Sequence, residues 1–304
     1  MSQFREAKMV AESDLLESRG FLSDINVWPD PLDLTIEAWL ANFDEDDKEL
    51  ARSLLESHVH VSQRQLAHGA TSAFVSISTR PEFGSGSGRQ DAWSAFIDRA
   101  YVTFPAAAVG DAAGSGQIFA RTIRDAGFDD GRIVPPEVCV SKMVTGPSDG
   151  QVVFVDDISA SGSQFARTWR RKIQTASGKK SFFDLAADGT IGAAYYVPLI
   201  ATTDAIDHIR REAPLVEVVP AYTLEDVYFA SAELTRLVEP DQRPGLDAFV
   251  RKYAARSGVV ADGPYGFGGI GLALSFHHAI PNNTLPILQK RSPSTLPDWK
   301  VLIS

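Results

Sequence analysis

Short apolar segments alternate with amphipathic segments between residues 91 and 222, and this alternation limits the fold more than any other feature of the sequence. The apolar segments have the length of buried strands, and the segments between them have the apolar spacing of helices. We predict strands at 101–109, 132–140, 152–157, 191–201 and 216–222, and helices at 91–100, 117–128, 164–176 and 202–213. Such alternation is typical of an α/β fold with a mostly parallel sheet and helices on both faces.

The N-terminal region has a different pattern. From Leu34 to about His58 the apolar spacing predicts two short helices, separated by the acidic residues 44–47, which offer a cap for the second helix. Residues 72–78 have a strand-like pattern, and the Gly/Ser-rich residues 81–90 indicate a flexible surface loop. We therefore expect a helical N-terminal extension.

Beyond Thr223 the alternation ends. Helices are predicted at 225–238 and 245–257, and the Gly-, Pro- and Asn-rich tail at 263–288 is expected to form strands or loops over the edge of the sheet. We divide the chain into a helical extension, an α/β core and a C-terminal part with a hood-like tail, packed as one compact unit. The three parts comprise residues 1–90, 91–223 and 224–304.

Composition excludes several classes of protein. The chain has 304 residues, of which 44% are hydrophobic, and can bury a substantial core. A net charge of −10 is opposite to the overall positive charge that favours nucleic-acid binding, and it suits a basic protein partner better. No stretch has the apolar length of a membrane span, and the N-terminus lacks the apolar centre of a signal peptide, so we expect a cytoplasmic protein.

Several features that could bind a metal or a nucleotide are interpreted as structural. His58 and His60 have no cysteine or acidic partner at metal-ligand spacing, and the single cysteine, Cys139, lies in an apolar run that indicates a buried thiol. Residues 266–271 fit GxGxxG, but no strand precedes them and no helical pattern follows. A strand ending in two acids also fits a Walker B motif, but that motif needs GxxxxGK[ST] upstream, and the chain has none.

Residues 152–164, VVFVDDISASGSQ, form the strongest candidate site. Ligands of α/β sheets bind beyond the C-terminal ends of the strands. Asp156 and Asp157 mark the end of the strand, where they can accept hydrogen bonds from ribose hydroxyls or from waters around Mg²⁺. The small residues that follow can turn their N–H groups toward a phosphate at the start of the next helix, with Ser163 as a candidate N-cap.

This stretch resembles the phosphoribosyl-pyrophosphate (PRPP) signature of type I phosphoribosyltransferases, which consists of an apolar strand, an acidic pair, a Ser/Thr/Gly loop and a helix. Residues 101–124 fall where that family has its first strand and pyrophosphate loop. Two departures concern the loop. The family usually has an apolar residue at Ser159, and a second glycine followed by threonine at Ser163 and Gln164. The segments WLANF, GPYGFGG and HHAIPNNTLPIL also resemble phosphoribosyltransferase-like proteins of bacterial conflict and anti-phage defence systems.

The resemblance implies a set of site residues and a reaction. Asp156 and Asp157 would hold the ribose hydroxyls of PRPP or a nucleotide, with Mg²⁺ arriving on PRPP and no protein side chain bound directly to the metal. The 5′-phosphate would be held by Ser159, Ala160, Ser161, Gly162, Ser163 and Gln164. The pyrophosphate would face Gly110, Asp111, Gly114, Ser115 and Gly116.

The resemblance also implies glycosyltransferase chemistry at ribose C1 in an effector or toxin-like protein with partners from the same operon. Three alternatives remain open at the level of sequence. The chain could transfer the ribosyl group, it could cleave a nucleotide such as NAD with water, or it could be an inactive phosphoribosyl-fold module that regulates a partner.

Overall fold

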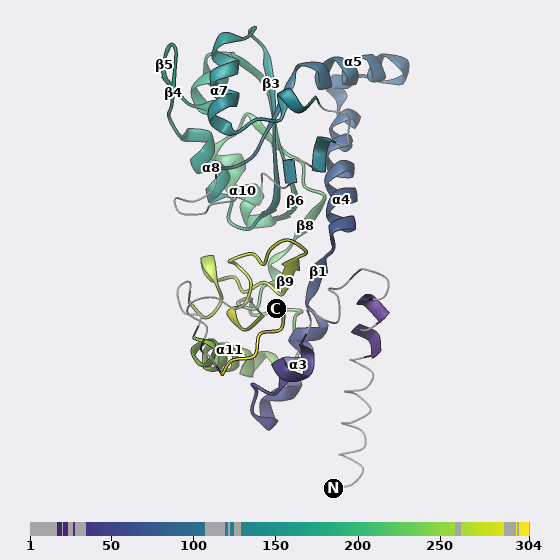
Figure 1. The fold of residues 1–304 in the computed structure, drawn as a ribbon, viewed down its shortest axis with the longest axis vertical. Helices are drawn as coiled ribbons and strands as arrows, with labels where there is room; N and C mark the ends of the chain where they lie inside the picture. The colour runs from purple at the N-terminus through teal and green to yellow at the C-terminus, as the bar shows by residue number, and fades with distance from the viewer. Residues whose placement is uncertain are drawn as a thin grey trace. The chain divides into compact units, whose positions relative to one another are not determined.

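The computed structural model describes residues 17–19, 21–23, 27, 35–106, 119–120, 122–124, 129–258, 263–288, 296 and 298–303. The chain forms two compact units (Figure 1). One is Leu66–Leu224, and the other combines Met1–Gln65 with Glu225–Ser304. The sequence-based division places residues 66–90 with the N-terminal extension, whereas in the structure they belong to the α/β unit, and the N-terminal helices share a unit with the C-terminal part.

A parallel five-stranded sheet forms the centre of the α/β unit. Its strands are β2 (Ala100–Thr103), β3 (Gly150–Ser159), β6 (Ile191–Thr202), β7 (Val216–Val218) and β8 (Tyr222–Leu224). The order is β2-β3-β6-β7, and β8 pairs with β6 beyond the end of β7. The two long strands, β3 and β6, pair along nearly their full length and are buried on both faces. The predicted α/β class with a parallel sheet is confirmed.

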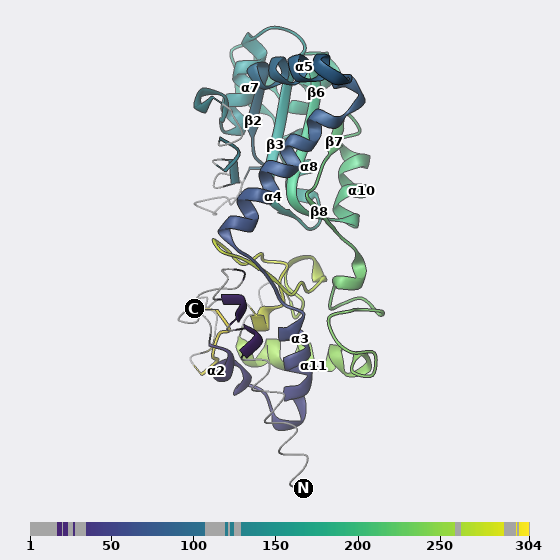
Figure 2. The ribbon, with the colours of Figure 1, turned by 90° about the vertical axis from the view of Figure 1, so that its right-hand side faces the viewer.

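Helices cover both faces of this sheet (Figures 1 and 2). On one face, side chains of β3 and β6 such as Phe154 and Tyr196 share a buried cluster with residues of four helices. These helices are α7 (Pro136–Thr145), α8 (Ser163–Arg170), α9 (Phe182–Ala187) and α10 (Thr203–Glu212). On the other face, Tyr195 contacts Phe96 of α5 (Gly86–Arg99), and Leu199 packs so closely on Gly69 of α4 (Gln63–Ser76) that a Cβ there would lie 2.4 Å from its Cδ1.

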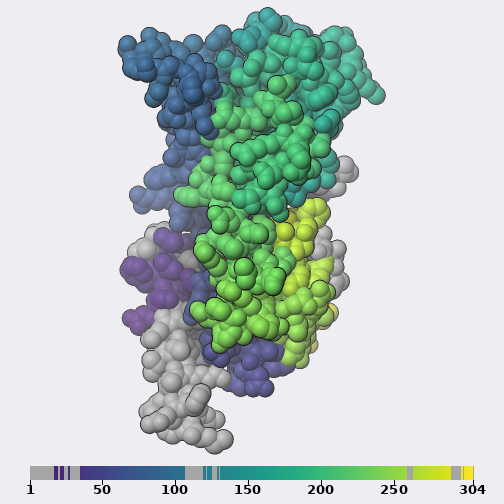
Figure 3. All heavy atoms as spheres, turned by 180° about the vertical axis from the view of Figure 1, so that it is seen from behind, coloured from purple at the N-terminus to yellow at the C-terminus, as the bar shows by residue number. Residues whose placement is uncertain are grey.

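The two helices on that second face correct the sequence-based expectation for residues 72–90. The predicted strand at 72–78 is wrong, because Leu66, Ala70, Phe74 and Ile77 are buried at helical spacing along α4 and the 3₁₀ turn Ile77–Thr79 that follows. The predicted flexible loop at 81–90 is also wrong. It contains the 3₁₀ turn Pro81–Phe83 and the first turn of α5, which projects from the surface of the unit (Figure 3).

Two predicted elements on the first face also differ. The predicted strand at 132–140 is mostly α7, because Pro136 suits the first turn of a helix and Cys139, Val140 and Met143 then face the core together. The helix predicted at 164–176 ends at Arg170, and an antiparallel hairpin of β4 (Ile173–Thr175) and β5 (Gly178–Lys180) follows. Cys139 is buried as predicted, and burial raises the pKa of its thiol.

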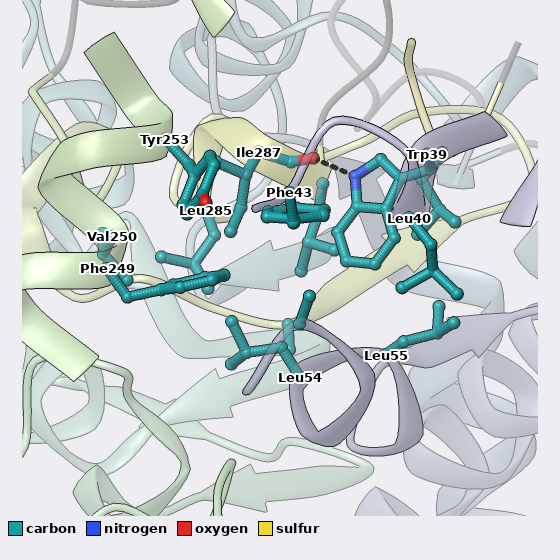
Figure 4. Close-up of a cluster of buried hydrophobic side chains, with 14 of the residues drawn as sticks. Trp39, Leu40, Phe43, Leu54, Leu55, Phe249, Val250, Tyr253, Leu285 and Ile287 are labelled. Carbon is teal, nitrogen blue, oxygen red and sulfur yellow. Dashed lines mark hydrogen bonds between the residues drawn. The ribbon is translucent and has the colours of Figure 1, made fainter. Parts of the chain in front are cut away.

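The second unit is organised around aromatic side chains from both ends of the chain. The predicted N-terminal helices are α2 (Ile36–Leu40) and α3 (Lys48–Glu56), and the predicted helix at 245–257 is α11 (Arg243–Ser257). Figure 4 shows Trp39 donating its Nε1–H to the Ile287 carbonyl oxygen at 2.7 Å. Phe43 lies at the centre, with ring centroids 4.6 Å from Tyr253, 4.7 Å from Trp39 and 5.4 Å from Phe249.

The rest of this unit consists mainly of turns. The helix predicted at 225–238 is wrong beyond the 3₁₀ turn Asp226–Tyr228, because Ala230 and Arg236 donate their N–H groups to the carbonyl oxygens of Gly271 and Val227 instead of continuing a helix. Two short parallel strands, β1 (Val59–Val61) and β9 (Leu274–Phe276), pair with each other. The other short elements of this unit are the 3₁₀ turns Glu45–Asp47, Phe267–Gly269 and Pro286–Leu288, and the α/β unit contains a further 3₁₀ turn at Asp130–Arg132.

The structure describes the surroundings of the features that the sequence analysis interpreted as structural. The glycine-rich residues 266–271 lead into β9 and not into a helix, so they lack the context of a dinucleotide fingerprint. His60 shares a hydrogen bond of 2.9 Å with Ser275, and burial lowers the pKa of His58 to about 3. The described residues contain no group of three or more His, Cys, Asp or Glu side chains placed to hold a metal, nor a helix with the length and apolarity needed to cross a bilayer.

Truncating the central ring of the second unit tests this packing. Phe43→Ala should lower the free energy of unfolding of that unit by about 3–5 kcal/mol, because it removes a buried ring that contacts four others, including Trp299. Denaturant titration followed by circular dichroism measures the change. Leu234→Ala, at a side chain that is 66% exposed in the same unit, is the control and should change stability little. Equal effects of the two substitutions would contradict the central role of Phe43.

Candidate functional site

The acidic pair of the predicted site lies near the end of β3, beside the parallel strand β6 and beyond the end of the pairing with β2. Asp156 and Asp157 are only 3% and 5% exposed. β6 pairs with β3 past the acids, with Asp156 opposite Pro198. A carboxylate buried this deeply needs hydrogen-bond donors around it.

Backbone and side-chain donors meet both carboxyl groups. The Tyr196 hydroxyl of β6 donates to Asp156 Oδ2 at 2.9 Å, and the Asp157 N–H donates to Asp156 Oδ1 at 3.1 Å. Asp157 Oδ1 accepts from the Ile158 N–H at 2.8 Å. Because a carboxylate has about four acceptor positions, these bonds leave room on the Asp156 oxygens for ligand hydroxyls.

Burial and mutual repulsion determine how the pair ionises. Burial raises the pKa of Asp156 well above its ordinary value, the neighbouring charge of Asp157 raises it further, and the bond from Tyr196 opposes both effects. Burial and the Asp156 charge also raise the pKa of Tyr196, so its hydroxyl remains a donor. The pair therefore takes up a proton more readily than two exposed aspartates, and it is suited to a ligand that donates hydrogen bonds or brings positive charge.

The loop that follows the acids turns tightly into α8. Gly162 has φ of +70° and is the N-cap of the helix, so the expectation that Ser163 is the N-cap is wrong. A Cβ at Gly162 would lie 2.8 Å from the Ala205 carbonyl oxygen of α10, which no larger residue could tolerate without a shift. Thr202 caps α10 by accepting from the Ala205 N–H, and donates to the Ala160 carbonyl at 2.7 Å.

The start of α8 has the properties of an anion site. Gly162 contributes no side-chain cap, and Ser161 Oγ accepts a long hydrogen bond of 3.4 Å from the Ser163 N–H. The first N–H groups of a helix have no partner within the helix, and they carry its positive dipole. Ser161 and Ser163 are partly exposed beside them. This arrangement can bind a phosphate at the turn.

Both departures from the family pattern have local partners. Ser159 is buried at the end of β3, where its hydroxyl lowers the pKa of Tyr196. Gln164 donates its Nε2–H to the Ala106 carbonyl at 3.3 Å, and Thr168 Oγ1 of the next turn accepts from the Ala106 N–H at 2.9 Å. The segment that leaves β2 is thus attached to the first turns of α8.

The structure thereby brings together the eight residues predicted at 156, 157 and 159–164, and it adds Tyr196 and Thr202, which sequence reasoning missed. The remaining candidates, Gly110, Asp111, Gly114, Ser115 and Gly116, lie outside the described residues. The strand predicted at 191–201 contains both Tyr195 and Tyr196, and side chains of neighbouring strand residues face opposite sides of the sheet. Only the register, in which Val153 pairs with Tyr195 and Phe154 with Tyr196, shows that Tyr196 is the one near Asp156, and the sequence does not reveal this register.

The raised pKa of Asp156 makes stability depend on pH. Above about pH 4 the folded protein holds more protons at this residue than the unfolded chain, so stability falls as the pH rises toward the folded-state pKa. Asp156→Asn cannot ionise. It should be more stable than wild type at about pH 8 and lose that advantage near pH 4, as measured by urea unfolding at both values.

Asp98→Asn, at an exposed position on α5, is the matched control and should follow the wild-type curve. A stability difference between Asp156→Asn and wild type that stays constant with pH would contradict the raised pKa of Asp156.

The turn at Gly162 provides a second test. Gly162→Ala should destabilise the protein by about 1–3 kcal/mol from the left-handed backbone alone, with a further loss from the contact with α10. Gly178→Ala in the β4–β5 hairpin is the control, since its φ is +102° but nothing lies within 4 Å of an added Cβ. Thermal unfolding should show the larger loss for Gly162→Ala, and equal losses would mean that the close approach to α10 is unimportant.

Comparison with known proteins identifies the family. The PRTase-CE family matches residues 36–304. Among solved structures, the chain is similar to orotate phosphoribosyltransferase from Aeropyrum pernix, with 15% identity, coverage of 44% of this chain and 72% of that chain, and a TM-score of 0.24. No match was found among curated proteins. The chain belongs to the PRTase-CE family of phosphoribosyltransferase-like proteins of conflict systems.

Proposed function

We propose that the chain binds PRPP, or a ribose 5-phosphate nucleotide, with Mg²⁺ at the C-terminal end of β3, and that it transfers or cleaves the bond at ribose C1. The observation that supports this most is the position of a buried carboxyl pair on the strand before a helix N-terminus whose N-cap residue, Gly162, contributes no side-chain cap. Carboxyl groups suit ribose hydroxyls, and the helix start suits the phosphate on the same sugar.

The loop from Ala160 to Gln164 is the proposed 5′-phosphate cradle. Its shape depends on Gly162 and on the bond from Thr202 to the Ala160 carbonyl, and both hold the loop against α10. A phosphate there would accept hydrogen bonds from the first N–H groups of α8 and from the hydroxyls of Ser161 and Ser163.

Asp156 and Asp157 are proposed to accept hydrogen bonds from the ribose hydroxyls. Their surroundings fit this role better than direct metal binding. The N–H groups of Asp157 and Ile158 and the Tyr196 hydroxyl already donate to their oxygens, and no third acidic, histidine or cysteine group joins them among the described residues. Mg²⁺ would instead be held by the oxygens of PRPP, where it supplies neutralising charge for the departing pyrophosphate.

In the proposed reaction the residues of the chain hold groups in position. The bond from C1 to pyrophosphate breaks, with positive charge developing on the ribose, while the acceptor's oxygen or nitrogen forms a bond to C1. The carboxyl pair fixes the ribose by its hydroxyls and places negative charge near the developing cation, and the cradle fixes the opposite end of the sugar. The acceptor would be a nucleobase, a macromolecule or water. We propose that segments outside the loop Ala160–Gln164 select it.

A second candidate is a catalytically inactive module that binds the same ligand and regulates protein partners from the same operon, as an effector in anti-phage defence. The observation that favours it is the attachment of Gln164 to the Ala106 carbonyl, because this position usually carries a phosphate-binding threonine in active relatives. Release of pyrophosphate from PRPP by the purified protein with any acceptor would argue against this candidate.

Removing both charges tests the binding site. Asp156→Asn with Asp157→Asn should weaken binding of Mg²⁺–PRPP at least about a hundredfold, because two acceptors that recognise the sugar hydroxyls lose their charge. Isothermal calorimetry with and without Mg²⁺ measures the change, and circular dichroism confirms that the variant is folded.

The matched control is Asp91→Asn with Asp98→Asn, which removes two exposed charges from α5 in the same unit and should leave binding unchanged. Equal affinity of the wild type and the Asp156/Asp157 variant would overturn the proposed function.

A further inference from the structure

The Tyr196 side chain is one of the largest fully buried groups of the chain, and it lies directly against the proposed site. Its ring stacks on Phe165 of α8, with centroids 4.3 Å apart and an angle of 28° between the planes. Phe165 in turn packs edge-to-face on Phe154 of β3 at 5.0 Å. The Tyr196 ring is therefore packed against α8 through Phe165, which itself packs on β3.

The hydroxyl of Tyr196 is bonded to β3. It donates to Asp156 Oδ2 at 2.9 Å. Ser159, buried on the same strand, lowers the pKa of Tyr196, as a hydroxyl donor near the phenolic oxygen does.

We propose that Tyr196 is a positioning residue for PRPP, which it does not itself contact: its hydroxyl holds the Asp156 carboxyl in the orientation and in the ionised form that accept the ribose hydroxyls. This inference rests on the proposed function. It also explains why a serine occupies position 159, where type I phosphoribosyltransferases usually have an apolar residue.

The charges around Asp156 are few, which makes the effect of Tyr196 measurable. Among the described residues, the titratable groups that affect Asp156 are Asp157 on the same strand and Tyr196 on β6, while α8 presents Phe165 to the tyrosine ring. Asp157 favours the protonated form of Asp156, and the Tyr196 hydroxyl favours the ionised form. Removing the hydroxyl should therefore raise the pH at which Asp156 ionises.

The chain contains a matched control one residue away. Tyr195 occupies the same strand but the opposite face, and its hydroxyl donates to Glu82 at 2.6 Å. Tyr196→Phe and Tyr195→Phe remove the same atom from neighbouring positions. Only the first alters the surroundings of Asp156.

Calorimetric titration of Mg²⁺–PRPP between about pH 5 and pH 9 tests the proposal. Near neutral pH, Tyr196→Phe should bind about tenfold more weakly than wild type, and the midpoint of its pH profile should lie about one unit higher, because the lost bond favours the charged carboxylate. Tyr195→Phe should match wild type at every pH. A Tyr196→Phe profile equal to that of Tyr195→Phe would overturn the proposal.

A purely structural role predicts a different result, namely lower stability with an unchanged pH midpoint. If Tyr196→Phe does not fold, Ser159→Ala replaces it, because that variant keeps the ring but removes the donor that polarises the hydroxyl. Its midpoint should move in the same direction by a smaller amount, and an unmoved midpoint would count against the proposal.

Ligand-free unfolding separates failure of this inference from failure of the proposed function. Without PRPP, Tyr196→Phe should lose more stability at about pH 8 than at about pH 5, because the missing bond is made to the ionised form of Asp156. If Tyr196→Phe shows this difference but wild type binds no PRPP, the link between Tyr196 and Asp156 stands and the proposed function fails. If wild type binds PRPP and neither pH profile moves, the proposed function stands and the positioning role fails.

Discussion

The pairing of β3 with β6 is the constraint on which the α/β unit depends. β6 runs parallel to β3 from Gly150 to Ser159, and both strands are buried on both faces. Successive side chains along each strand therefore pack against the helices on opposite faces of the sheet. The same register places Tyr196 of β6 where its hydroxyl reaches Asp156. A shift of one residue would turn Tyr196 toward α5 and present Tyr195 to the acids, so the fold and the candidate site are specified by one set of backbone hydrogen bonds.

The site combines groups that are unfavourable for stability on their own. Two adjacent carboxyl groups with about 95% of their surface buried repel each other, and water cannot screen them. Donors from Tyr196 and from two backbone N–H groups reduce this penalty without removing it, as the raised pKa of Asp156 indicates. A buried charge pair that remains partly uncompensated is expected where a ligand supplies the missing donors, and this is the physical basis of the proposed ribose site.

The loop departs from the family pattern at two positions, and the structure shows what each residue does instead. Ser159 is buried at the end of β3, and Gln164 donates to the Ala106 carbonyl. The turn itself depends on Gly162, since its left-handed backbone and its contact with α10 both disfavour a side chain. A glycine also belongs to the family pattern in this loop.

Sequence alone determined the α/β class, the strand that carries the acids and the order of acids, small-residue turn and helix. These follow from local alternation of apolar residues and from residue types that suit strand ends and turns. It did not determine residues 72–78 or 132–140, whose apolar residues fit a short strand and a helix equally well until the packing of α4 and α7 decides between them. Nor could it identify Tyr196, because a residue that is 40 positions from Asp156 in sequence becomes its neighbour only through strand register. Local pattern specified which groups are present, and the long-range pairing of β3 with β6 decided which of them meet.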